Sequence, residues 1–401
     1  LGYSRPAYEG FDQKKLSYLD SIAISAIDSM MAPGIQMLVS KKGKIVYNKS
    51  FGYHTYKKIN KLENDHVFDL SSITKILATM PLVIQEYETG NLSLNTKLNE
   101  LFPKRKLADK GEITLKEMLS HFARLRPWIP FYEETLNRKE KPKSRFYKTN
   151  FRSSFSTPVS ENLYLKKNYK DKIFKSIVES ELIEKLEFKY SDLPFYFLKF
   201  WFEEIYNKPL DLLAEERIFN KLQLERTMFN PYKKIKLDEI VPSEEDDFFR
   251  YSKLHGYVHD EGAAMLGGVS GHAGLFSNSY EVAVILQAMI QGGIYNNHRL
   301  FKSESFDVFN TCYFCEYDNR SGVGFDKPQI EGNHGSTFGG VSMNSFGHYG
   351  YTGSMAWADP DEEIIFVFLS NRTFPTRENT LLQKSNIRTR SQEIIYKSII
   401  D

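Results

Sequence analysis

Ser72 and Lys75 lie three positions apart in the segment 68–79. If that segment is helical, residues three apart share one face and their side chains can touch. A serine hydroxyl is a weak nucleophile that needs a base, and a lysine can be that base only if burial or a nearby positive group lowers its pKa. The spacing therefore indicates an acyl-enzyme site with Ser72 as nucleophile, although the same pair also occurs often by chance.

The segment Tyr190-Ser191-Asp192 is a second candidate. A tyrosine beside a lysine can transfer a proton to or from a leaving group. The same residues also fit a structural role, in which Ser191 or Asp192 caps the helix expected from Leu193. Taken alone, the segment favours that structural role.

The glycine-rich segment 347–353 is a third candidate, and it also fits an ordinary hairpin. Glycines allow a strand to approach a ligand closely. The backbone N–H of Tyr351 could form an oxyanion hole with that of Ser72. His348 could offer a hydrogen bond or a positive charge to a substrate carboxylate.

The other chemistry-bearing residues predict neither a metal site nor a cofactor. His272 stands beside two glycines and is expected to be structural, with contact to a cleft as the alternative. Cys312 and Cys315 form a Cys-x-x-Cys pair, but no second such pair and no His-x-x-x-His accompanies it. A structural role is therefore expected, rather than a redox or zinc site.

Composition limits the class of protein. The chain has 401 residues, of which 41% are hydrophobic and 26% are charged, as in an ordinary globular protein. A net charge of +2 gives no electrostatic reason to expect nucleic acid or an anionic membrane as partner. The most apolar run, 364–369, has the length of a strand, so no transmembrane segment is predicted.

Elements that could position these residues follow from apolar periodicity and from Gly, Pro and capping signals. Helices are expected over 14–30, after Phe68, over 114–121, 193–228 and 280–291, and over 385–400. Strands are expected over 35–39, 44–48, 346–351, 354–358 and 364–370. Because strands occur near both chain ends, we predict an α/β (α+β) fold with an antiparallel sheet built from both ends and flanked by helices.

We expect a single domain with two lobes. The α/β lobe comprises about 1–80 and 278–401, and a mainly helical lobe comprises about 81–277. Within the helical lobe, residues 124–176 are rich in Lys, Arg, Ser, Asn and aromatic residues, which predicts an irregular insertion. This insertion fits a lid or cleft wall and a plain surface excursion equally well.

The order of the three candidates resembles that of the serine β-lactamase-like family, which includes class C β-lactamases, D-alanyl-D-alanine peptidases and family VIII esterases. The motifs of that family are Ser-x-x-Lys, Tyr-x-Asn and Lys-Thr-Gly, or His-x-Gly in esterase-like members. Similar stretches are 68–79, Leu119-Ser120-His121, 271–277 and 371–377, so the resemblance covers most of the chain outside 124–176.

The resemblance implies a β-lactamase/transpeptidase-like fold and a role for each motif residue. Ser72 would be the nucleophile, Lys75 its base partner and Tyr190 the general acid/base. The substrate edge would comprise Asp192, His348, Gly350 and the oxyanion-hole residue Tyr351.

Three departures from the family pattern concern substrate recognition. Asp192 replaces an amide that can donate, whereas an ionised carboxylate only accepts. His348 replaces a lysine and is largely uncharged at neutral pH, and the bulky Tyr349 replaces a threonine. We therefore expect an esterase or D-alanyl-D-alanine peptidase acting on a small-molecule or cell-wall-derived peptide substrate, rather than a true β-lactamase.

Two further expectations concern context. The alternative function is a non-catalytic module that binds glycan or peptide on the same fold, including a domain fused to a family 3 glycoside hydrolase. Because the chain begins at Leu1 without a signal peptide, we expect a mature or excised piece of a larger polypeptide. The family implies an exported protein of the bacterial periplasm or cell envelope.

Overall fold

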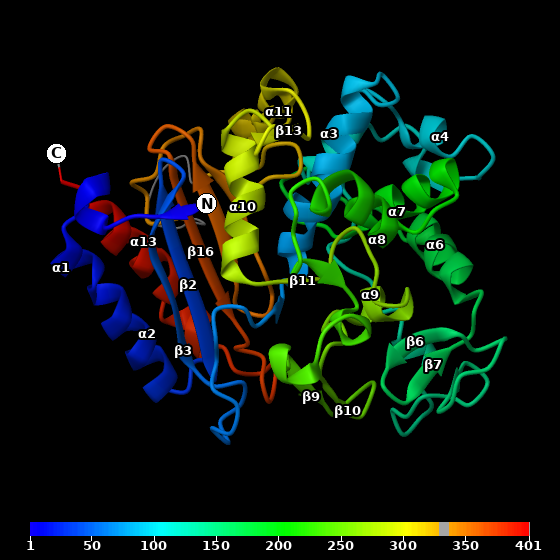
Figure 1. Cartoon of the computed structure of the whole chain (residues 1–401). Coiled ribbons are helices and arrows are strands. Elements are labelled where there is room, and N and C mark those ends of the chain that lie inside the picture. The colour runs from blue at the N-terminus through cyan, green and yellow to red at the C-terminus, as the bar shows by residue number, and fades with distance from the viewer. Residues whose placement is uncertain (329–336, 401) are drawn as a thin grey trace.

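The computed structural model describes residues 1–328 and 337–400. A six-stranded sheet has the order β1–β3–β2–β16–β15–β14. Its strands are β1 (Gly2–Tyr3), β2 (Gly34–Lys41), β3 (Lys44–Gly52), β14 (Phe346–Tyr349), β15 (Met355–Asp359) and β16 (Ile364–Ser370). The N-terminal and C-terminal strands meet where β2 pairs antiparallel with β16 (Figure 1). The sheet predicted from both chain ends is confirmed, except that the short β1 pairs parallel with β3.

Helices cover both faces of this sheet (Figure 1). On β16, Phe366 and Phe368 pack in one apolar cluster with residues of α2 (Tyr18–Asp28) and α13 (Ile387–Lys397). The alternate residues 365, 367 and 369 pack in the other cluster with α10 (Ser279–Ile290). This alternation follows from the two-residue period of a strand. The helix expected over 14–30 is divided at Ser17 into α1 (Gln13–Leu16) and α2.

Most of the remaining elements lie between residues 80 and 277. The other α-helices are α3 (Met80–Glu88), α4 (Leu98–Leu101), α5 (Leu115–Leu119), α6 (Tyr169–Glu179), α7 (Leu193–Tyr206), α8 (Leu210–Ala214), α9 (Glu261–Met265), α11 (Ser303–Asn310) and α12 (Leu381–Lys384). The other strands are β4 (Phe68–Asp69), β5 (Tyr147–Lys148), β6 (Thr157–Ser160), β7 (Leu163–Leu165), β8 (Met228–Phe229), β9 (Glu244–Asp246), β10 (Ser252–Leu254), β11 (Leu275–Ser277), β12 (Ile294–Tyr295) and β13 (His298–Arg299).

The insertion 124–176 is more ordered than its composition predicts. It contains the three-stranded sheet β5–β7–β6, and its last part belongs to α6. Phe131 and Tyr147 are buried in the main core, which anchors the insertion to the rest of the protein. Most of 124–168 consists of turns and loops, as an irregular insertion would, but the three strands were not predicted because strands of two to four residues leave no recognisable alternation.

Two observations concern the cysteines and membrane-spanning segments. Cys312 and Cys315 form a disulfide in the loop after α11, a pairing that the sequence did not predict. Within the described ranges, no helix has the length and apolar character needed to cross a bilayer.

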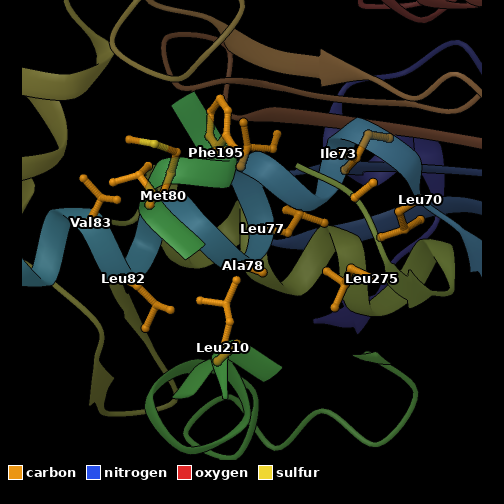
Figure 2. Packing of buried hydrophobic residues seen from close by; sticks show 14 of the residues in the cluster. Leu70, Ile73, Leu77, Ala78, Met80, Leu82, Val83, Phe195, Leu210 and Leu275 are labelled. Atoms are coloured by element: carbon orange, nitrogen blue, oxygen red, sulfur yellow. The ribbon is translucent and has the colours of Figure 1, made fainter. Parts of the chain in front are cut away.

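The segment that carries Ser72 and Lys75 is helical, as predicted, but irregular. A 3₁₀ turn (Ser71–Ile73) leads into a π-helical turn (Lys75–Thr79), which continues as α3. Figure 2 shows how its apolar side chains, among them Ile73, Leu77 and Met80, pack against Phe195, Leu210 and Leu275. The segment that carries Ser72 and Lys75 is therefore anchored by buried packing.

Replacing Leu77 by alanine is expected to lower the free energy of unfolding by about 2 to 5 kcal/mol, the usual effect of truncating a fully buried leucine. Leu212→Ala, at a side chain that is 48% exposed on α8, is the matched control and should change it by less than about 0.5 kcal/mol. Urea denaturation followed by circular dichroism measures both. Equal effects of the two substitutions would contradict the packing described.

Candidate active site

Ser72, Lys75 and Tyr190 meet as the sequence predicts. The Lys75 ammonium nitrogen Nζ lies 2.7 Å from Ser72 Oγ, and the Tyr190 hydroxyl donates to the same oxygen at 3.0 Å. Ser72 lies on the 3₁₀ turn, Lys75 begins the π-helical turn, and Tyr190 lies three positions before the first residue of α7. The serine oxygen is therefore held between an amine and a phenol.

Lys75 is fully buried, and its Nζ has three oxygen neighbours. Besides Ser72 Oγ, these are Asp192 Oδ1 at 2.7 Å and the carbonyl oxygen of His272 at 3.3 Å. A neutral amine has two N–H donors and one lone pair. In that form Lys75 can donate to Asp192 and His272 and accept the proton of Ser72, which is the geometry a general base needs.

The environment separates the roles of Lys75 and Tyr190. Burial lowers the pKa of Lys75, and the carboxylate of Asp192 acts against that shift. Burial and the same carboxylate raise the pKa of Tyr190 well above its usual range. Tyr190 therefore keeps its proton at neutral pH and can donate it, whereas Lys75 is the better proton acceptor.

Asp192 lines the cleft, and its carboxylate contacts Lys75 and Tyr190 directly. It forms an ion pair with Lys75 and accepts a hydrogen bond from the Tyr190 hydroxyl at 3.2 Å. Its side chain is only 15% exposed. The sequence showed a carboxylate two residues after Tyr190 but gave no indication of this ion pair.

The end of β14 lies directly against the nucleophile turn. A Cβ atom on Gly350 would come within 2.7 Å of the Leu70 carbonyl oxygen, so only glycine permits this approach. Beyond it, Thr352 Oγ1 donates to the Asp69 carbonyl oxygen at 2.9 Å and lies 3.3 Å from Ser71 Oγ. These contacts fix the loop that carries Tyr351 beside Ser72. The oxyanion hole formed by the backbone N–H groups of Ser72 and Tyr351 stays a prediction.

His348 is buried and lies near Tyr190, with ring centroids 5.9 Å apart. Burial lowers the pKa of His348, so the imidazole is neutral at neutral pH. Its Nδ1 is 2.7 Å from the carbonyl oxygen of Tyr349, and this hydrogen bond requires the proton on Nδ1. His348 therefore presents an acceptor nitrogen, Nε2, rather than the positive charge considered from the sequence.

Two further histidines position the site. Burial lowers the pKa of His121 to about 3, and its neutral ring accepts the N–H of Ser191 at 3.2 Å and packs on Tyr190. His272 bridges Ser270 Oγ and Asp260 Oδ1, and its ring stacks on Tyr196. The structural role predicted for His272 is confirmed.

The site opens into a cleft of about 640 Å³. Its walls include Trp128 from the insertion, Tyr351, and three charged residues that the sequence did not single out, Arg320, Asp326 and Arg388. The insertion therefore contributes to the cleft wall. In the described parts of the chain, no group of His, Cys, Asp and Glu side chains could hold a metal ion.

Comparison with known proteins agrees with this geometry. The chain matches the Beta-lactamase family over residues 23–386. A Salmonella agona protein with the provisional name D-alanyl-D-alanine carboxypeptidase is 31% identical over 398 residues, covering 93% of this chain and 86% of its own length.

Two solved structures share the fold at low identity. One is EstCE1, a hydrolase with promiscuous acyltransferase activity, with a TM-score of 0.68, 17% identity, and coverage of 96% of this chain and 99% of its own. The other is a penicillin-binding protein homologue from Caulobacter crescentus, with a TM-score of 0.67, 16% identity, and coverage of 97% and 99%. The chain therefore belongs to the beta-lactamase family, and it is a serine hydrolase of the β-lactamase and penicillin-binding-protein type.

Proposed function

We propose that this hydrolase acts through an acyl-enzyme on Ser72 and cleaves an ester or amide. The observation that carries the proposal is the position of Ser72 Oγ, within hydrogen-bond distance of both an amine and a phenol in an open cleft. A general base and a general acid within reach of one nucleophile are what acyl transfer requires.

The proposed acylation follows from these positions. Lys75 Nζ takes the Ser72 proton as Oγ attacks the carbonyl carbon, and the resulting oxyanion accepts hydrogen bonds from the N–H groups of Ser72 and Tyr351. When the carbon–leaving-group bond breaks, Tyr190 donates its proton to the leaving atom. The Lys75 ammonium then returns a proton to Tyr190 through Asp192, which contacts both. A water molecule then attacks the carbonyl carbon of the acyl-enzyme through the same proton transfers, which frees Ser72 and releases the carboxylic acid product.

We further propose a peptidase or esterase that acts on a cell-wall-derived peptide. The name of the Salmonella agona relative supports a D-alanyl-D-alanine peptide as substrate. Asp192, ion-paired with Lys75, cannot donate to a substrate amide carbonyl, which speaks against penicillin-type recognition. An enzyme with this substrate would work in the cell envelope.

The test is covalent labelling. Folded protein treated with a fluorophosphonate, and separately with a labelled penicillin, should carry the fluorophosphonate adduct on Ser72 when digested and mapped by mass spectrometry. Ser71→Ala should still be labelled, and Ser72→Ala should not. Folded protein without an adduct on Ser72 from either reagent, together with equal ester turnover by wild type and Ser72→Ala, would instead support the non-catalytic binding module.

A further inference from the structure

Positive charge is concentrated in residues 137–175, which we call the basic segment. It contains twelve Lys and Arg against three Asp and Glu, a net charge of +9, although the net charge of all 401 residues is only +2. The rest of the protein therefore carries a net charge of −7. The small net charge of the whole chain, which gave no reason to expect an anionic partner, conceals this asymmetry.

Most cations of the basic segment are exposed and have no acidic partner. Ten of the twelve residues are exposed, and the other two, Lys143 and Lys148, are half-buried. Within the described parts of the chain, acidic side chains form ion pairs with only two of the twelve, Lys172 and Lys175. The positive potential of the other ten is therefore not cancelled locally and can attract an external anion.

The outer face of the small sheet β5–β7–β6 is basic and aromatic. Tyr147 on β5 pairs with Leu165 on β7, and both side chains are buried in the main core. The next pair, Lys148 and Tyr164, must face outwards, because side chains alternate between the two faces of a strand. The ring of Phe151 contacts that of Tyr164 edge-on, with centroids 6.2 Å apart, and Phe151 is 65% exposed. This face therefore combines a lysine with an exposed aromatic ring.

Backbone hydrogen bonds bring further cations to the same part of the surface. The N–H of Lys166 donates to the Phe146 carbonyl oxygen at 2.9 Å, and the N–H of Lys167 donates to the Ser154 carbonyl oxygen at 3.0 Å. Arg152 lies two residues before Ser154 and is exposed, as are both lysines. Cations of the turn after β7 and of the loop after β5 therefore lie on neighbouring backbone segments.

The basic segment lies at one edge of the molecule. Figure 1 shows β6 and β7 on the side opposite α1 and α2, with the six-stranded sheet between them and the rest of the protein. A broad partner can therefore reach this edge without displacing other elements.

The residue types indicate the kind of anion that this edge would bind. Nine of the twelve cations are lysines, whose flexible point charges suit many mobile headgroups, whereas bidentate recognition of single phosphates favours arginine. Anionic bilayers attract clusters of lysine and arginine, and aromatic side chains enter the boundary between headgroups and acyl chains. Exposed lysines beside the exposed ring of Phe151 fit both parts of such a surface.

We propose that the basic segment binds the surface of an anionic phospholipid bilayer. Its Lys and Arg side chains contact the headgroups, and Phe151 enters the boundary between headgroups and acyl chains. This is adsorption to a surface and requires no membrane-spanning helix. The inference rests on charge and exposure alone, so it goes beyond the proposed acyl-enzyme function and does not depend on it.

The test measures sedimentation of the protein with lipid vesicles. Wild type should bind vesicles of equal parts phosphatidylglycerol and phosphatidylcholine but not pure phosphatidylcholine, and raising NaCl from about 0.1 M to about 0.5 M should release it. The triple variant Arg152→Gln/Lys166→Gln/Lys167→Gln should lower the partition coefficient by about 100-fold, because each cation near an anionic surface contributes about fivefold.

The matched control removes the same charge from another part of the surface. Lys57, Lys58 and Lys61 are exposed, lie between β3 and β4, and are outside the basic segment. Replacing all three by glutamine should keep vesicle binding within about twofold of wild type, because charges that do not face the bilayer are screened. Circular dichroism should show that both triple variants fold like wild type. Equal weakening of both would overturn the proposal, since binding would then follow net charge alone.

Phe151→Ser distinguishes a bilayer from a soluble polyanion. Loss of the ring should weaken vesicle binding by about 10-fold, the effect of removing a buried aromatic side chain from an apolar phase. Retention of the same variant on a heparin column should equal that of wild type, because heparin offers no apolar phase. Wild-type protein that binds heparin but not anionic vesicles would overturn the proposal and assign the basic segment to a soluble polyanion.

Discussion

Replacing Lys75 by methionine is expected to reduce kcat/KM for an ester substrate by about 10²- to 10⁴-fold, the usual contribution of a general base. Methionine keeps much of the buried volume of the side chain but cannot accept the Ser72 proton. The same change leaves the carboxylate of Asp192, which is 15% exposed, without its cation. The free energy of unfolding should therefore also fall, by about 3 to 5 kcal/mol.

The double variant Lys75→Met/Asp192→Asn separates the two effects. Removing the uncompensated carboxylate should restore most of the stability, measured by thermal or urea unfolding. The rate should stay low, because the proton acceptor is still missing. Recovery of the rate together with the stability would show that Lys75 acts only as a structural cation.

Replacing Asp192 by asparagine is expected to move the acidic limb of the kcat/KM profile to lower pH. Lys75 must be neutral to accept a proton, so activity rises as pH passes through its pKa. The Asp192 carboxylate at 2.7 Å stabilises the ammonium and raises that pKa, against the lowering effect of burial. Removing the charge should shift the limb downwards by about 1 to 3 pH units.

Asp326→Asn is a second variant that should move the same limb of the pH profile, but by less. The Asp326 carboxylate also raises the pKa of Lys75, but it makes no direct contact with the amine and its effect is smaller. Its removal should therefore shift the same limb in the same direction by less. An upward shift for Asp192→Asn, or no shift at all, would assign the limb to a group other than Lys75.

The meeting of Ser72, Lys75 and Tyr190 could be predicted from the sequence because their spacing and order carry the information. Ser72 and Lys75 are one helical turn apart, and in the structure Lys75 Nζ and the Tyr190 hydroxyl lie 2.7 and 3.0 Å from Ser72 Oγ. The charge balance of the site could not be predicted in this way. The ion pair of Asp192 with Lys75 depends on which side chains are packed together from distant segments.

The same distinction applies to the fold. The long strands β2 and β16, of eight and seven residues, were predicted because each contains a run of apolar residues that leaves a clear signal. The strands of the small sheet β5–β7–β6 were not predicted, because each spans only two to four residues. The division of the first helix at Ser17 likewise reflects tertiary packing, since the apolar spacing continues across it.

The pairing of β2 with β16 also governs how the chain can fold during synthesis. The hairpin β2–β3 is made first, but one edge of β2 has no partner until β16, near the other end of the chain, has been synthesised. An uncovered strand edge can pair with other chains. The hairpin must therefore stay soluble while most of the protein is still being translated, and closure of the sheet is a late, long-range step that should slow folding. Arg388 follows β16 in the chain, so the cleft is completed only after this step, and nascent chains should be inactive.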